Sequence, residues 1–223
     1  VAIAAAVKPV DDHFARSRLL CLENTKDGTA QSVARMDEAL AVGRQHGLAT
    51  HLDGARMWNA AIELGISGAA LAAPFDSVSM CLSKGLGAPA GSVLSGSADF
   101  IREARHWRKM LGGGMRQAGI LAAAGIYALD NHVGRLADDH ARAARLADGL
   151  DAMPQVRLLA RNTNMIFLEI DGDQATSQTA LNEAGIVCLL SSGRPITARL
   201  VMHLGITDKD VDQTIDGFWA ALR

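Results

Sequence analysis

Two residues that follow apolar runs could do chemistry together, and the first of them is Lys84. A short apolar run within residues 79–89 ends in Ser83-Lys84, and a glycine-rich turn follows. At the end of a buried strand an ammonium loses hydration, and burial favours the neutral amine. A neutral amine condenses with an aldehyde to a Schiff base, so this lysine is predicted to carry pyridoxal phosphate (PLP). A surface lysine just past a strand is the alternative.

The second residue is Asp53, in a stretch that is typical of a strand, a turn and then a helix. An acid at the carboxyl end of a parallel strand points into the crevice where open α/β sheets bind ligands. A carboxylate against the pyridine nitrogen of PLP keeps that nitrogen protonated, and the protonated ring is an electron sink for a carbanion at Cα. Asp53 fits that role and Lys84 fits the Schiff base, on successive strands. Alone, Asp53 could equally cap the following helix.

Three long motifs carry a family resemblance. They are similar to the low-specificity L-threonine aldolases, which are aspartate-aminotransferase-like, fold-type I PLP enzymes; the motifs span residues 51–60, 76–92 and 108–119. Shorter stretches add to the match, which covers nearly the whole chain; they span residues 12–16, 22–25 and 199–204. The resemblance implies an α/β fold, with part of a fold-type I PLP large domain built on a mostly parallel sheet, plus a small α+β C-terminal domain.

The resemblance also implies roles for single residues. Lys84 would be the catalytic Schiff-base lysine and Asp53 the partner of the pyridinium. Arg56 would place its guanidinium near the phenolic oxygen of the cofactor. His13 would face the substrate near its β-hydroxyl, as a catalytic and substrate-binding residue. Arg199 would bind the substrate carboxylate, for which a guanidinium offers a bidentate fork.

Further candidates come from the residues themselves. Lys109 and Arg116 flank the glycine turn 112–114, and such a turn with cations beside it suits a phosphate or a carboxylate. We predict that both bind the cofactor in a neighbouring subunit's site, with a solvated charged loop as the alternative. His51 shares a side of its strand with the acid and is predicted to be packed and hydrogen-bonded. His132 is predicted to be a solvated helix residue.

The sequence departs from the family pattern in two places. Family members are longer at the N-terminus, where they carry a serine, a phosphate-binding turn and a stacking histidine that do not occur here. The chain opens with Val1 and no initiator methionine, so we expect the C-terminal part of a threonine aldolase. The family also has a histidine where Lys26 stands, which leaves the contribution of that loop to the site open.

Composition and charge exclude several classes of partner. The chain has 22 basic and 24 acidic residues and no lysine or arginine block, so nucleic acid and anionic membrane are poor partners. The longest apolar stretch, residues 119–129, is too short to span a bilayer. Cys21, Cys81 and Cys188 lie in apolar runs without metal-site spacing and are predicted to be buried thiols in a reducing, cytoplasmic compartment. The expected partners are an amino acid substrate and further copies of the chain, as a dimer or tetramer.

Strands and helices alternate in the first part of the chain, which predicts a largely parallel sheet. Strands are expected at 19–22, 48–52, 77–82 and 92–94, with helices at 32–46, 57–64, 98–109 and 115–129. The last of these helices is hydrophobic on most sides and is expected to be buried. A helix at 133–150 leads into a second part, with strands at 156–159, 165–170, 186–190 and 199–203 and helices at 174–183 and 208–222. We expect a PLP-binding portion over residues 1–130 and a small domain over 131–223.

These observations predict PLP-dependent aldol cleavage of β-hydroxy-α-amino acids. Threonine and allo-threonine would give glycine and acetaldehyde, and His13, or a water that it orders, would remove the hydroxyl proton. The alternative is a non-catalytic fragment that needs its missing N-terminal part or a partner chain. A third possibility is another fold-type I enzyme, such as a serine hydroxymethyltransferase, and the run 112–117 argues against it.

Overall fold

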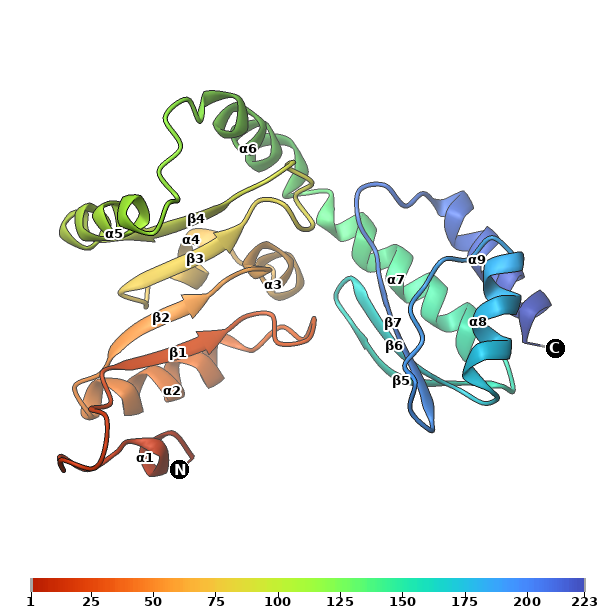
Figure 1. Cartoon of the computed structure of the whole chain (residues 1–223), viewed down its shortest axis with the longest axis horizontal. Helices are drawn as coiled ribbons and strands as arrows, with labels where there is room; N and C mark the ends of the chain where they lie inside the picture. Colours follow the sequence, from red (N-terminus) through yellow and green to blue (C-terminus); the bar gives the residue numbers. More distant parts are fainter. Residues whose placement is uncertain (1, 223) are drawn as a thin grey trace. The chain divides into compact units, whose positions relative to one another are not determined.

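The computed structural model describes residues 2–222, and the chain forms two compact units. The first unit extends to Val133 and the second begins at Gly134. The domain boundary proposed from the sequence, near Asp130, lies within the last helix of the first unit, α6 (Gly119–His132). Each unit has its own sheet and its own hydrophobic core (Figure 1).

The first unit is built on a four-stranded, mostly parallel sheet. Its strands are β1 (Leu19–Glu23), β2 (Ala49–Asp53), β3 (Ser77–Cys81) and β4 (Ser92–Gly96), in that spatial order. The first three are parallel, and β4 returns antiparallel to β3. The predicted strands are confirmed to within about two residues, and the sheet and its crossover helices make the unit an α/β structure.

One face of this sheet carries the core of the first unit. Leu52 of β2 and Val78 of β3 are buried there against α2 (Val33–Gln45), α3 (Met57–Leu64) and α4 (Gly68–Ala72). The ends of these helices follow from local signals that the sequence displays. The Ser32 hydroxyl accepts a hydrogen bond from the Arg35 N–H at the start of α2, and Gly65 ends α3 in a left-handed conformation.

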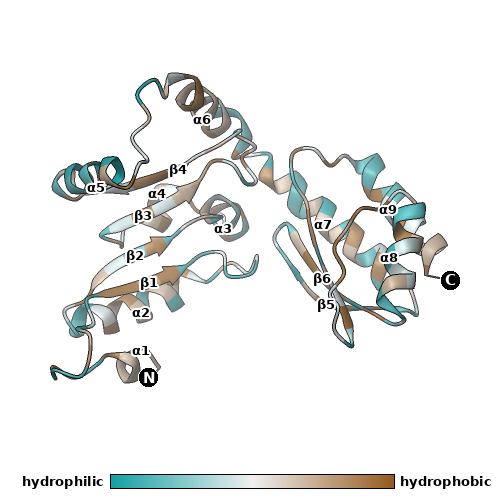
Figure 2. Ribbon diagram, viewed as in Figure 1, coloured by the Kyte–Doolittle hydropathy of each residue, from teal (hydrophilic) through white to brown (hydrophobic). Residues whose placement is uncertain are grey.

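The remaining helices of the first unit are α1 (Ala2–Ala6), α5 (Ala98–Met110) and α6. The prediction that the apolar helix is buried is wrong for this chain. Only Gly125 and Ala128 of α6 are buried, while Ile120, Ile126 and Tyr127 are exposed. Figure 2 shows the contrast between the hydrophilic α5 and the more hydrophobic α6. An all-round apolar pattern tells how much surface a helix could bury, but the surrounding elements decide how much it does bury.

The second unit is a three-stranded antiparallel sheet with three helices. The strands are β5 (Val156–Asn162), β6 (Met165–Ile170) and β7 (Ile196–Val201), in that order. The helices are α7 (Leu136–Asp151), α8 (Gln174–Glu183) and α9 (Asp208–Ala221). The core joins them through residues such as Leu146, Leu168, Leu181 and Phe218, all essentially inaccessible.

Two expectations about apolar runs are wrong. The predicted strand at 186–190 is instead an extended loop, in which Leu190 makes one isolated bridge and Val187 and Leu189 are about 90% exposed. Among the three cysteines, Cys21 is exposed and the other two are half-buried, and burial raises the pKa of the Cys188 thiol. An apolar run becomes a strand only where a neighbouring strand pairs with it.

Among the helices that the structure describes, none is both long enough and apolar enough to cross a membrane.

Candidate functional site

The carboxyl edge of the parallel strands brings the predicted acid beside polar neighbours. Glu23 and Asp53 end β1 and β2, and both lie in register with Ser79 in the middle of β3. In parallel strands, residues in register point to the same face of the sheet. Asp53 is therefore on the face opposite the buried Leu52, and its side chain is half-buried.

The backbone around Asp53 is held from both neighbouring strands. The Asn24 N–H donates to the Asp53 carbonyl at 3.1 Å, and the Gly54 N–H donates to the Ser79 carbonyl at 2.8 Å. The Asp53 Oδ1 accepts the Ala55 N–H at 3.1 Å. The cap proposed as an alternative is thus partly present, because the carboxylate closes the turn before α3. One hydrogen bond to a backbone amide leaves a carboxylate with further acceptor capacity for a ligand.

Gly54 is required by the close approach of the strands. A Cβ at this position would lie 2.8 Å from the Ser79 carbonyl oxygen and 3.1 Å from the Met57 side chain. Two residues further on, Arg56 is the N-cap residue of α3 and is half-buried. The Asp-Gly-Ala-Arg turn therefore places Asp53 and Arg56 at the same end of the sheet.

His51 lies on the same face as the acid and is hydrogen-bonded, as predicted. Its Nδ1 lies 2.8 Å from the Ser77 Oγ and its Nε2 lies 3.3 Å from the Ser79 Oγ. Hydroxyl groups donate and accept, so the two serines satisfy both ring nitrogens in either neutral tautomer. The sequence reasoning did not single out Ser77 or Ser79, although their alternation with Val78 shows that they share this face.

Lys84 lies in the turn between β3 and β4, and its side chain is exposed. The premise that it is buried at a strand end is wrong for this chain, because the turn buries Leu82 and Leu86 and leaves Lys84 exposed. The turn is closed locally. The Gly87 N–H donates to the Lys84 carbonyl at 2.9 Å, and the Ala88 N–H donates to the Leu82 carbonyl at 3.0 Å. An exposed amine remains accessible to an incoming carbonyl compound.

His132, at the end of α6, is not the solvated residue that was predicted. It is half-buried, and its Nδ1 lies 2.6 Å from the carbonyl oxygen of Leu86, in the turn that carries Lys84. The contact joins residues 46 positions apart. No local sequence signal could have revealed it.

The loop after β1 is organised by the buried Asn24. Its Nδ2 donates to the Gln31 carbonyl at 3.1 Å, and its Oδ1 accepts the Gln31 N–H at 3.0 Å. Lys26 lies in the small hairpin between them and forms ion pairs with Asp27 and Glu23. Hydrogen bonding to Asp27 and the charges of both acids raise the pKa of Lys26, so its amine remains protonated at neutral pH.

Two of the predicted site regions lie apart from this edge. His13 precedes the amino end of β1, its side chain is 89% exposed, and its Nδ1 lies 2.7 Å from Asp11. Figure 1 shows the segment between α1 and β1 at the strand starts. The structure therefore does not bring His13 to the carboxyl edge. Lys109 and Arg116 are exposed on either side of the glycine turn that follows α5.

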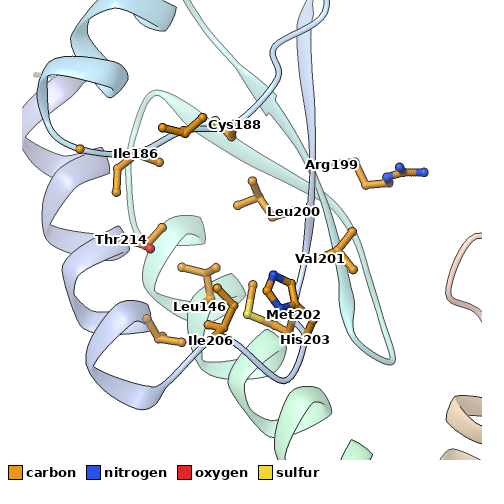
Figure 3. A pocket seen from close by; sticks show the side chains of 13 residues that line it. Leu146, Ile186, Cys188, Arg199, Leu200, Val201, Met202, His203, Ile206 and Thr214 are labelled. Atoms are coloured by element: carbon orange, nitrogen blue, oxygen red, sulfur yellow. The ribbon is translucent and has the colours of Figure 1, made fainter. Parts of the chain in front are cut away.

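Arg199 belongs to the second unit, where it lies in β7 opposite Phe167 of β6. Its neighbours Ala198 and Leu200 face the core, and its own side chain is exposed. A hollow of about 360 Å³ borders the strand, and Figure 3 shows Arg199 on the opposite side of the strand from Leu200. The guanidinium is thus presented on the outer face of this sheet, available to an anion.

The chain is similar to known proteins over almost its whole length. The family model described as beta-eliminating lyase matches residues 1–173. The chain is 43% identical to the low specificity L-threonine aldolase of Escherichia coli (strain K12), over 98% of this chain and 64% of that protein. It is 44% identical to the low-specificity L-threonine aldolase 1 of Arabidopsis thaliana, over 99% of this chain and again 64% of the relative. The chain thus spans about two thirds of the length of these curated relatives.

Solved structures agree in fold. The Leishmania major threonine aldolase superposes with a TM-score of 0.80 at 22% identity, over 96% of this chain and 64% of that one. A Sphingomonas wittichii serine palmitoyltransferase superposes with a TM-score of 0.70 at 20% identity, over 92% and 55%. At such identities the likeness concerns the fold alone.

Proposed function

Because the chain belongs to the beta-eliminating lyase family, we propose that it is part of a PLP-dependent aldolase that cleaves β-hydroxy-α-amino acids. L-Threonine and L-allo-threonine are the proposed substrates, with glycine and acetaldehyde as products. The proposal draws on L-threonine aldolases of Escherichia coli and Arabidopsis thaliana that are 43% and 44% identical to this chain. The structural observation that carries it is Asp53 at the carboxyl edge of a parallel sheet whose next strand leads into the Lys84 turn.

The side chains at this edge fit the cofactor. PLP requires an accessible amine, an acid for its ring nitrogen and a cation for its phenolic oxygen. Lys84 is exposed, Asp53 is half-buried with its backbone fixed on both sides, and Arg56 follows it after a single turn. Lys84, Asp53 and Arg56 are therefore the residues that would hold PLP in this chain.

The chemistry of the proposed reaction divides among these groups. When bound, PLP supplies a carbonyl that bonds to amines and a protonated ring that accepts electrons released at Cα. Asp53 would hold the cofactor at its ring nitrogen. Lys84 would hold it through a covalent bond from its amine. Arg199 would bind the substrate carboxylate through its two parallel N–H groups.

His13, which the sequence predicted as the base for the β-hydroxyl proton, is not part of the proposed site. His13 precedes β1, whereas Asp53 and the Lys84 turn follow the strand ends. A general base has to come within hydrogen-bond reach of the proton that it removes. We therefore leave His13 out of the proposed site. The alternative of a non-catalytic fragment is not favoured by the comparisons with aldolases.

The proposal includes association of several copies of the chain. Lys109 and Arg116 flank an exposed glycine turn, and we propose that they contribute to the cofactor site of a neighbouring copy in a dimer or tetramer. The exposed apolar side chains of α6 would be buried by such association.

A cytoplasmic location is proposed because the three cysteines are free thiols and form no disulfide among the described residues.

Reduction with borohydride tests the proposal at the reacting amine. The chain is incubated with PLP, reduced, digested and mapped by mass spectrometry. The label is expected on the peptide that contains Lys84 and should be lost in Lys84→Arg, which keeps the charge but cannot form the bond. Lys209 in α9 serves as an exposed internal reference. A label that is confined to Lys109 or Lys26 would overturn the assignment.

A further inference from the structure

The turn that carries Lys84 is tied to the end of α6. His132 is the last residue of that helix, one residue before the first unit ends at Val133. Its Nδ1 lies 2.6 Å from the carbonyl oxygen of Leu86, two residues after Lys84, and Leu86 is 2% exposed. The contact therefore fixes the buried part of a turn whose lysine is exposed.

The chemistry of this contact fixes the protonation of one ring nitrogen. A carbonyl oxygen only accepts hydrogen bonds, so the Nδ1 of His132 must carry the proton. This holds for one neutral tautomer and for the imidazolium. The Tyr127 ring meets the His132 ring edge-on, with centroids 5.4 Å apart and an interplanar angle of 86°, which supports the orientation of the imidazole.

A second contact holds the same turn from α6. A Cβ on Gly125 would lie 2.8 Å from the Cδ1 of Leu82, so the helix backbone packs closely on this side chain. Leu82 precedes Lys84 by two residues, and Leu86 follows it by two. The helix thus contacts the turn on both sides of the lysine, through packing at Leu82 and through a hydrogen bond at Leu86.

We propose that His132 is a positioning residue for Lys84. The proposal rests on the proposed function, because it takes Lys84 as the amine that bonds the cofactor. Among the described residues, the backbone hydrogen bonds of the turn join residues 82–91 to one another, as between Gly87 and Lys84 or between Leu82 and Gly91. The hydrogen bond from His132 ties the turn to α6, so its loss should let the turn move and misplace the amine. Small misplacements of reacting groups are costly in rate.

Two substitutions separate the hydrogen bond from the bulk of the ring. His132→Asn retains an N–H donor close to the position of Nδ1, whereas His132→Phe retains a ring and removes the donor. Gly125→Ala disturbs the turn at the other contact, in a helix position where alanine is favoured over glycine. This third variant keeps the proposal testable if His132→Phe fails to fold, which circular dichroism would show.

The first measurement is amide exchange in the 223-residue chain without cofactor. The Gly87 and Ala88 amides should exchange roughly three- to tenfold faster in His132→Phe, the range expected for losing one net hydrogen bond. In His132→Asn the exchange rates of these two amides should stay within about twofold of those in the unchanged chain. The amide of Leu168, in the sheet of the second unit, is the internal control and should not change.

The second measurement is the rate at which PLP becomes fixed to Lys84 on borohydride reduction, relative to the exposed Lys209 of α9. His132→Phe and Gly125→Ala should lower this ratio by about tenfold, and His132→Asn should restore it. Equal ratios in all variants would overturn the positioning role, even if amide exchange changes. Unchanged exchange in His132→Phe would overturn the anchor itself. If the unchanged chain bears no label on Lys84, the proposed function fails, and amide exchange alone then decides the anchor.

Discussion

Replacing Gly54 by alanine is the sharpest test of how the site is held. The added Cβ would lie 2.8 Å from the Ser79 carbonyl oxygen, a backbone atom of the neighbouring strand. Ordinary contact for a Cβ begins near 3.4 Å, so the two strand ends would have to separate by about 0.6 Å. The same movement stretches the bond from the Gly54 N–H to that carbonyl, which is now 2.8 Å.

The expected cost has two parts. Overpacking of a buried position costs about 1–3 kcal/mol of the free energy of unfolding. Asp53 immediately precedes Gly54, so its carboxylate moves with the turn. A displacement of roughly half an ångström should lower the rate of threonine cleavage about tenfold, beyond any loss of folded protein.

Urea unfolding measures the first part, and cleavage of threonine together with trapping of PLP on Lys84 measures the second. Gly119→Ala is the matched control, because its Cβ would meet nothing within 4 Å. That variant should be neutral in both assays. If Gly54→Ala unfolds with a free energy within about 0.5 kcal/mol of the unchanged chain, the inferred close approach is wrong.

Three further predictions concern single side chains. Asp53→Asn should keep the fold and lower turnover on the order of 10²-fold or more, since it removes one preorganised charge; near-normal turnover would exclude Asp53 from the mechanism. Asn24→Ala should cost about 1–3 kcal/mol in urea unfolding, because it leaves the half-buried backbone N–H and carbonyl of Gln31 without the bonds from Asn24; a change below about 0.5 kcal/mol would contradict this role of Asn24. Hydrogen bonds from the Thr50 N–H and hydroxyl lower the pKa of Asp76. The contribution of Asp76 to the free energy of unfolding is therefore present above the ordinary pKa of 3.8 and is lost as the pH falls through the lowered value. In Asp76→Asn the free energy of unfolding should fall less steeply with pH over this acid range.

The local signals in the sequence predicted the helices and strands well where a cap or a stop defines them. The helix that Gly65 ends has the predicted bounds Met57–Leu64, and Gln174–Glu183 was also predicted residue for residue. The strand predicted at 186–190 was wrong because a strand forms only where a neighbouring strand pairs with it. The predicted burial of Lys84 was wrong for another reason, since the turn after β3 buries Leu82 and Leu86 and leaves Lys84 exposed.

By itself, the sequence determined the mostly parallel arrangement of the first sheet, the α+β character of the second unit and the candidates Asp53 and Lys84, because turns, caps and alternation are local physics. The candidate Arg56 came from the family resemblance. Only the tertiary structure decided that His132 contacts Leu86 and that His13 lies at the opposite end of β1 from the acid. Such relations depend on how distant segments pack, and no short stretch of sequence encodes a contact across 46 residues.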